Sequence, residues 1–212
     1  MRYVQWIVVL VVGLVVQSAL AADPDPATPQ GAQKVVRAAA DKGDKAEVRK
    51  FLHSSNPTEE KLADAIAENA VVGAAAYKAA VAKFGEEETR KTLMGVVPLH
   101  PPESEEAKTE WKIEGDRATV VSTGKTEFAG PPLTKIDGIW KMAMKEVIAD
   151  RPKAEVQQMT QLMEKQSNLM TEYTKEVQDG KYKTAAELRQ VALERMQVMI
   201  KQMQAAATQP AK

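Results

Sequence analysis

The stretch Leu133-Thr134-Lys135-Ile136-Asp137-Gly138-Ile139-Trp140-Lys141-Met142 decides the architecture of this 212-residue chain. Asp-Gly between two apolar runs is a strong signal for a β-hairpin, because both residues accept the positive φ angles of a tight turn. After the turn, Trp140, Met142 and Met144 alternate with lysines, which is typical of a half-buried antiparallel strand. The stretch therefore predicts an antiparallel sheet with one face against a core.

A second hairpin is predicted just upstream. Trp111-Lys112-Ile113 and Ala118-Thr119-Val120-Val121 flank Glu114-Gly115-Asp116-Arg117, a turn sequence with Gly and Asp. Gly130-Pro131-Pro132 then provides a bend between the two hairpins. Residues 109–148 are therefore expected to form a short antiparallel meander.

A long helix is predicted before the sheet. It starts at Asn56-Pro57-Thr58-Glu59, where Asn caps, Pro occupies the first helical position and Glu lies at the third. Apolar and small residues continue at helical spacing to Phe84, and Gly85 is a suitable stop. We expect this helix to pack against the sheet, with Gly73 and the neighbouring alanines at the closest contact.

Shorter helices are expected on either side of the long one. One ends at Gly43, and Asp44 caps the next with Glu47 three residues on. Another runs from Glu86 to about Met94, and no strand is predicted among these helices. Prolines then make residues 95–108 a loop.

The segment 150–207 returns to helical periodicity. Asp179-Gly180 divides it into two helices, each with an apolar stripe, so a helical hairpin is expected. The stripes consist of Val156, Met159, Met163, Met170, Tyr173 and Val177, and of Tyr182, Ala185, Leu188, Ala192, Met196, Met199 and Met203. Docking in cis is expected because Arg151-Pro152 leaves almost no linker; partner binding or dimerisation is the alternative, favoured by the adaptability of methionine.

The N-terminus has the order of a secretory signal peptide over residues 1–21. A positive start precedes an apolar run from Tyr3 to Val16, and Ala19-Leu20-Ala21 forms a cleavage pattern. The alternative is a retained membrane anchor, but a spanning helix needs roughly 20 apolar residues and this run is shorter. We therefore expect a periplasmic or extracellular protein with no membrane span after cleavage.

These patterns together predict an α+β fold. N-terminal helices pack on a short curved meander sheet in a cone-like domain over 32–149, followed by the helical hairpin over 150–207. A disordered linker with three prolines is expected over 22–31, and a frayed tail over 208–212.

Helices followed by Ile113-Glu114-Gly115-Asp116-Arg117-Ala118-Thr119-Val120 and by residues 133–141 resemble the nuclear-transport-factor-two-like superfamily. The resemblance covers about residues 32–148 and is to its SnoaL-like, cystatin-like-cone, secreted bacterial members. It implies a curved sheet wrapped round helices, with a pocket that Tyr77, Trp111 and Trp140 are candidates to line. Enzymes of the superfamily carry acid/base residues in the cone; none matches here, so no catalytic residue is assigned.

Several classes of chemistry have no support in the sequence. The 29 basic and 29 acidic residues show no clustered basic footprint, so no nucleic-acid partner is expected. There is no cysteine for a disulfide or lipid anchor, and His53 and His100 are far apart, so neither metal nor cofactor is expected. The methionine stripes offer thioethers for Cu(I), but core packing is favoured. The acidic runs 86–88 and 103–106 are interpreted as solvated.

These considerations favour an exported, non-catalytic binding or interaction protein of unknown ligand, acting on another envelope protein or on itself through residues 150–207. The alternative is a small-molecule enzyme using a cone-shaped pocket. A concave apolar pocket that holds a buried Asp, Glu or His would favour the enzyme.

Overall fold

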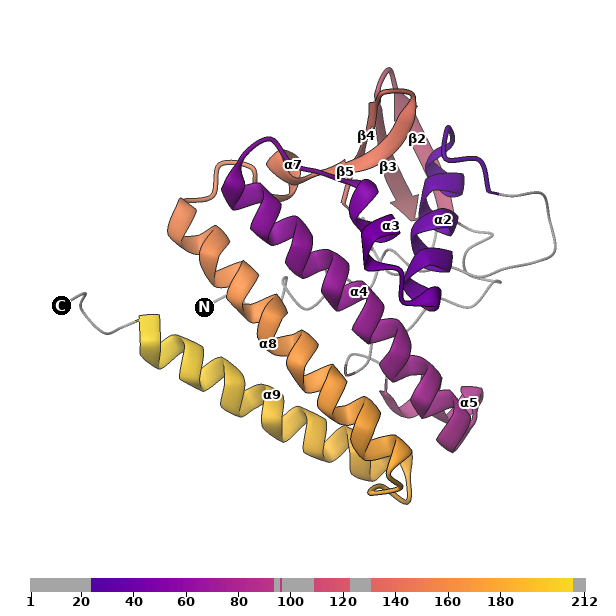
Figure 1. The fold of residues 1–212 in the computed structure, drawn as a ribbon, viewed down its shortest axis with the longest axis vertical. Helices are drawn as coiled ribbons and strands as arrows, with labels where there is room; N and C mark the ends of the chain where they lie inside the picture. Colours follow the sequence, from indigo (N-terminus) through magenta and orange to yellow (C-terminus); the bar gives the residue numbers. More distant parts are fainter. Residues whose placement is uncertain (1–23, 94–95, 97–108, 123–130, 208–212) are drawn as a thin grey trace.

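The computed structural model describes residues 24–93, 96, 109–122 and 131–207. Within them the fold is α+β, as predicted (Figure 1). The elements are α2 (Pro29–Lys42), α3 (Lys45–Lys50), β1 (Leu52–His53), α4 (Pro57–Phe84), α5 (Glu86–Leu93), β2 (Thr109–Glu114), β3 (Arg117–Ser122), β4 (Leu133–Ile136), β5 (Ile139–Ala143), α7 (Met144–Ile148), α8 (Lys153–Gln178) and α9 (Ala185–Ala207). The expected signal peptide, His100, the acidic run 103–106, most of the loop 95–108 and the tail 208–212 lie outside the described residues.

The five-stranded sheet has the order β1-β5-β4-β3-β2. Strands β2 to β5 form the predicted antiparallel meander, closed at its turns by the pairs Glu114–Arg117 and Ile136–Ile139. Asp137 and Gly138 have φ angles of 54° and 79°, which a tight hairpin turn of this kind requires. The Asp-Gly signal therefore places this hairpin correctly.

Strand β1 is not anticipated by the sequence. Its two residues pair in parallel with Met142 and Ala143 of β5, which makes the sheet mixed. Arg49 fixes the strand: Nη1 donates to the Leu52 carbonyl at 2.5 Å and Nη2 to Ser54 Oγ at 2.7 Å. Two residues are too few to produce a recognisable alternation.

Helix α7 corrects the expected end of the last strand. Alternation through Trp140, Met142 and Met144 suggests one continuous strand, but β5 ends at Ala143 and Met144 begins α7. Met144 is still fully buried, so its apolar character serves a helix instead. Thr134 Oγ1 donates to Glu146 Oε1 at 2.5 Å and thereby ties α7 to β4.

The linker expected over 22–31 is partly structured. Helix α2 begins at Pro29, and Thr28 Oγ1 accepts from the Gly31 N–H at 3.0 Å as its N-cap. The residues just before lie against β5, because the Trp140 backbone N–H donates to the Pro26 carbonyl at 3.2 Å. The prolines therefore shape a helix start rather than a free linker.

Helix α4 has the predicted boundaries. Asn56 Oδ1 accepts from the N–H groups of Thr58 and Glu59, both at 3.0 Å, and the helix ends at Gly85, whose φ is 84°. The Glu59 carboxylate accepts in return from the Ser55 N–H at 2.6 Å. The capping interactions inferred from the sequence are thus present.

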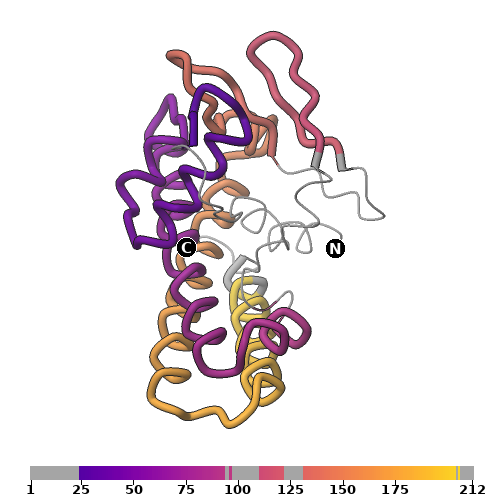
Figure 2. Tube along the Cα trace, turned by 90° about the vertical axis from the view of Figure 1, so that its right-hand side faces the viewer, coloured from indigo at the N-terminus to yellow at the C-terminus, as the bar shows by residue number. Residues whose placement is uncertain are grey.

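The principal packing partner of α4 differs from expectation. Its most extensive contact is with α8, which runs alongside it in the same direction (Figures 1 and 2), although α4 also shares a core with the sheet. Asn69 is buried in this contact, and its Nδ2 donates to Ser167 Oγ at 3.2 Å and to the Met163 carbonyl at 3.4 Å. Helix α8 therefore docks in cis, against α4 more than against the sheet.

Two apolar clusters hold the described residues together. The main core joins the sheet, α2, α3 and the first half of α4 to Val156, Met159 and Met163 of α8. The second cluster joins the second halves of α4 and α8 to α5 and to the first half of α9. Because α8 contributes to both, packing does not divide the chain at residue 150.

Candidate functional site

The structure does not bring the three candidate pocket residues together. Trp140 is 3% exposed in the main core, and its Nε1–H donates to the Ala27 carbonyl at 2.9 Å. Trp111 is half-buried beside the same core. Tyr77 belongs to the second cluster, where burial raises the pKa of its hydroxyl and Arg90 lies 5.8 Å from its ring centroid. The two tryptophans therefore share one side of the sheet, and Tyr77 is separate.

Side chains fill the inner face of the sheet, where the superfamily resemblance implies a pocket. Leu133, Trp140 and Met142 belong to one packed cluster with Leu62 and Ile66 of α4. Grooves between helices lie elsewhere in the described part of the chain, two of them beside α8. Neither is lined by Tyr77, Trp111 or Trp140.

The first of these, the α8–α9 groove, has a volume of about 460 Å³. It is lined by Lys165, Asn168, Leu169, Glu194, Arg195, Val198, Met199 and Gln202. Val198 is 53% exposed there, one of the most exposed large apolar side chains in the described residues, while Met199 is buried. The groove thus combines apolar side chains with charges of both signs.

A polar cluster at the turn between α8 and α9 holds Arg195, which lines this groove. Arg195 Nη2 donates to Glu176 Oε1 at 2.9 Å, Lys181 Nζ donates to the same oxygen at 2.5 Å, and the Tyr182 hydroxyl donates to Glu176 Oε2. Burial alone would raise the pKa of Glu176, but these three hydrogen bonds outweigh it and lower the pKa to about 2. The carboxylate therefore stays ionised and holds Arg195 at the groove.

Tyr173 of α8 makes a second set of contacts with α9. Its hydroxyl donates to the Ala192 carbonyl at 3.4 Å, and the Arg195 guanidinium lies 5.4 Å from its ring centroid. Burial raises the pKa of Tyr173 to about 12. These contacts join the end of α8 to the first half of α9.

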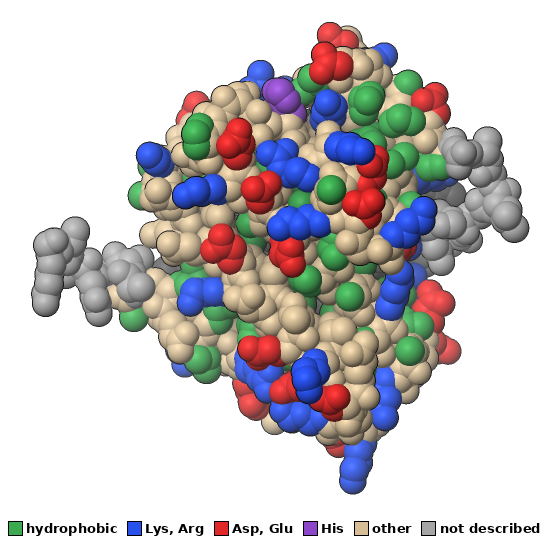
Figure 3. All heavy atoms as spheres, in the orientation of Figure 1, with side chains coloured by type: hydrophobic (Ala, Val, Ile, Leu, Met, Phe, Trp, Pro, Cys, Tyr) green, Lys and Arg blue, Asp and Glu red, His purple; other side chains and the backbone are tan. Residues whose placement is uncertain are grey.

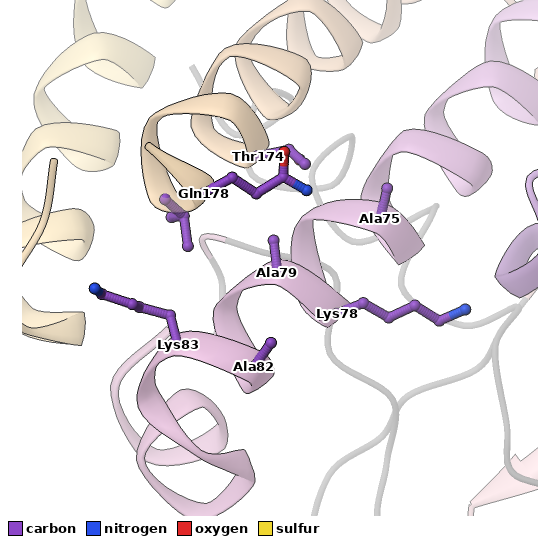
Figure 4. Close-up of a pocket in the computed structure, with 8 residues that line it drawn as sticks. Ala75, Lys78, Ala79, Ala82, Lys83, Thr174 and Gln178 are labelled. Carbon is purple, nitrogen blue, oxygen red and sulfur yellow. The ribbon is translucent and has the colours of Figure 1, made fainter. Parts of the chain in front are cut away.

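The second groove, the α4–α8 groove, has a volume of about 500 Å³. It is lined by Ala75, Lys78, Ala79, Ala82, Lys83, Thr174, Val177 and Gln178. Figure 4 shows Ala79 directed toward Thr174 and Gln178 of α8, so small side chains form one wall. Lys78 pairs with Asp41 at 3.6 Å. The apolar side chains that line this groove are three alanines and Val177, smaller than those of the α8–α9 groove.

The face seen in Figure 3 carries both signs of charge in alternation rather than a patch of one sign. Ion pairs such as Arg49–Asp64 at 2.7 Å and Lys45–Glu68 at 2.9 Å join opposite charges of α3 and α4. Among the described residues, no three or more His, Cys, Asp or Glu side chains are grouped to hold a metal. His53 lies partly exposed in β1.

The methionines considered for Cu(I) are divided between packing sites. Met159 and Met163 are buried in the main core with Met142 and Met144. Met199 lines the α8–α9 groove on a different helix. The α8 thioethers are thus part of a close-packed apolar core.

No family model matches the chain, and neither a curated protein nor a solved structure shows significant similarity to it. The nuclear-transport-factor-two-like resemblance therefore stays a prediction. None of the described helices is both long and apolar enough to cross a membrane.

Proposed function

We propose that the chain is an exported, non-catalytic binding protein whose recognition surface is the α8–α9 groove. The proposal rests on one observation: Val198 exposes 53% of its surface beside Leu169 and the buried Met199, in a groove fixed by the Glu176 cluster. Large apolar side chains gathered in a hollow of the surface favour a binding role. The leader-like sequence over 1–21 supports an exported location.

The chemistry of the groove suits an amphipathic helix of another envelope protein. A groove between two helices that offers apolar side chains from both accepts the apolar stripe of a third helix. Met199 adapts its shape to the incoming side chains, because the thioether chain is unbranched and flexible. Lys165, Glu194 and Arg195 supply charges of both signs at the rim, which set the orientation of the partner.

The enzyme alternative has no comparable observation in its favour. The inner face of the sheet is occupied by Leu133, Trp140 and Met142. The carboxylate with the most strongly lowered pKa, Glu176, is engaged by three hydrogen-bond donors at the helical turn.

The test compares Val198→Glu with Gln197→Glu, which adds the same charge on the same helix. Gln197 is exposed and lies two residues from the buried Met199, so it faces away from the groove. Each protein is tagged, exported and used to recover bound proteins from the envelope fraction. We expect Val198→Glu to reduce recovery of the partner about tenfold, equivalent to about 1.4 kcal/mol, and Gln197→Glu to leave it unchanged.

Both variants are also melted, because a groove variant with an unchanged melting temperature shows that the fold is intact. Equal recovery by the two variants, or no protein specifically recovered by the native chain, contradicts the proposal.

A further inference from the structure

Among the described residues, strand β2 forms the long edge of the sheet. The strand order places β2 at one end and the two-residue β1 at the other. Within the described ranges, no strand pairs with the outer side of β2. Figure 2 shows the β2–β3 hairpin standing apart from the helices. An open edge presents unpaired N–H and C=O groups that pair readily with another strand.

The hairpin register determines which groups face outward. Glu114 and Arg117 flank a two-residue turn and therefore form a hydrogen-bonded pair. The Asp116 carbonyl accepts from the Lys135 N–H at 2.7 Å and therefore points toward β4. This agrees with Arg117 bonding to β2, because the backbone groups of successive residues point alternately to the two neighbouring strands. The backbone groups of Glu110 and Lys112 then point to β3, and those of Trp111 and Ile113 point outward.

We propose that β2 pairs antiparallel with β2 of a second copy of this chain, about a two-fold axis at Trp111. In this register Trp111 lies opposite Trp111 of the second copy, so their outward N–H and C=O groups bond to each other. Thr109 and Ile113 form the next hydrogen-bonded pairs on either side. Glu110 then lies directly opposite Lys112 of the second copy, and Lys112 opposite Glu110.

Charge complementarity selects this register over its neighbours. Outward-facing residues must oppose outward-facing residues, so the strands shift relative to each other in steps of two. The register centred on Lys112 places Lys112 opposite Lys112 of the second copy and Glu110 opposite Glu114. The register centred on Glu110 places Glu110 opposite Glu110. Pairing centred on Ile113 does set Lys112 opposite Glu114, but it places Trp111 and Glu110 opposite Gly115 and Asp116 of the turn, where β2 has ended, so fewer residues pair. Like charges directly opposite each other destabilise a strand pair.

Exposed charges on an edge strand commonly serve to prevent association. The side chains of Lys112 and Glu114 are 61% and 66% exposed and pair with each other at 2.8 Å. Charges alternate in sign along this face of β2, so a parallel in-register pairing would place like charges opposite each other. The antiparallel register centred on Trp111 places opposite charges together instead. Pairing covers the β2 edge of both copies, and the other edge strand, β1, has only two residues. The assembly therefore stops at a symmetric dimer instead of extending into a longer sheet.

The apolar side chains of β2 agree with this interface. Ile113 is 52% exposed, and Trp111, on the same face of the strand, is only half-buried. In the proposed dimer, each of these residues lies beside Trp111 of the second copy. The pairing therefore covers an apolar side chain that the single chain leaves open to water.

The first test is a charge swap read by sedimentation equilibrium. The native chain is expected to dimerise, and Glu110→Lys or Lys112→Glu alone to weaken dimerisation at least about tenfold, or about 1.4 kcal/mol. The double variant Glu110→Lys/Lys112→Glu is expected to restore it, because the opposed charges are attractive again. Lys153→Glu, the same charge change on the exposed start of α8, is the control and should have no effect.

A native chain that sediments as a monomer at every accessible concentration overturns the proposal. So does a double variant that dimerises no better than the single ones. Neither result bears on the α8–α9 groove, because β2 is not part of that surface.

The second test fixes the register, using the absence of native cysteine. Residues opposite each other in a non-hydrogen-bonded pair have Cα atoms about 4.5 Å apart, within the range that a disulfide bridges. Mixing Glu110→Cys with Lys112→Cys under oxidising conditions should therefore give a disulfide-linked heterodimer, and either variant alone should not cross-link. Linked homodimers of Glu110→Cys, or no cross-link in the mixture, contradict the Trp111 register.

Discussion

Replacement of Trp140 by alanine tests how the sheet, α2 and the N-terminal turn depend on one another. The indole is 3% exposed in the main core, so truncation leaves a cavity that neighbouring elements only partly fill. Large-to-small core substitutions of this kind cost about 3–5 kcal/mol. Loss of the hydrogen bond from Nε1 to the Ala27 carbonyl adds about 1 kcal/mol. The sum is a large fraction of the stability of an ordinary domain.

The free energy of unfolding is measured by urea denaturation followed by far-ultraviolet circular dichroism. Trp140→Phe is the matched control: it keeps most of the apolar contact but removes the donor, so a loss of about 1–2 kcal/mol is expected. A loss below about 1 kcal/mol for Trp140→Ala would show that the indole is accessible to water, and the assignment of this strand face would be wrong.

Three further perturbations probe the helical packing. Truncation after Asp150 should expose the apolar stripe of α4 and cause aggregation, since α8 is the main partner of α4; an unchanged melting temperature would refute docking in cis. Asn69→Ala should lower the free energy of unfolding by about 1–3 kcal/mol, because its bonds to Met163 and Ser167 lie inside the α4–α8 contact; a neutral effect in denaturant titration would argue against that contact. Glu176→Gln should destabilise the chain near pH 7. Because the folded pKa of Glu176 is lowered to about 2, its stabilisation is present above the unfolded pKa of about 4.3 and is lost as the pH falls toward 2. The melting temperatures of variant and native chain should converge over that window, and a constant difference would contradict it.

Sequence rules located elements with clear start and stop signals. Asn56-Pro57 and Gly85 delimit α4, and Asp137-Gly138 defines a hairpin, because each fixes a backbone conformation locally. Thr28-Pro29 carries the same start signal as Asn56-Pro57, but the run of prolines around it is typical of a linker. The hydrogen bond from the Gly31 N–H to Thr28 Oγ1 is the local signal that marks the start of α2.

Other features depend on tertiary contacts that no local pattern encodes. Strand β1 exists because β5 supplies its hydrogen bonds, and α7 begins where an apparently continuous alternation of apolar residues still runs. Tyr77 lies apart from the tryptophans because α4 is long enough to span both clusters. The sequence offers one signal for the α8–α9 groove: Val198 is apolar but lies outside the predicted apolar stripe of α9.

Site-specific photo-cross-linking at position 198 tests the proposed binding role most directly. A photoreactive residue is placed at Val198 or, as control, at Gln197, and the exported protein is irradiated inside the intact cell. A groove that receives a partner helix should give a discrete covalent adduct from position 198 and none from position 197. Equal labelling from both positions, or adducts from neither, would contradict the assignment of the α8–α9 groove as the recognition surface.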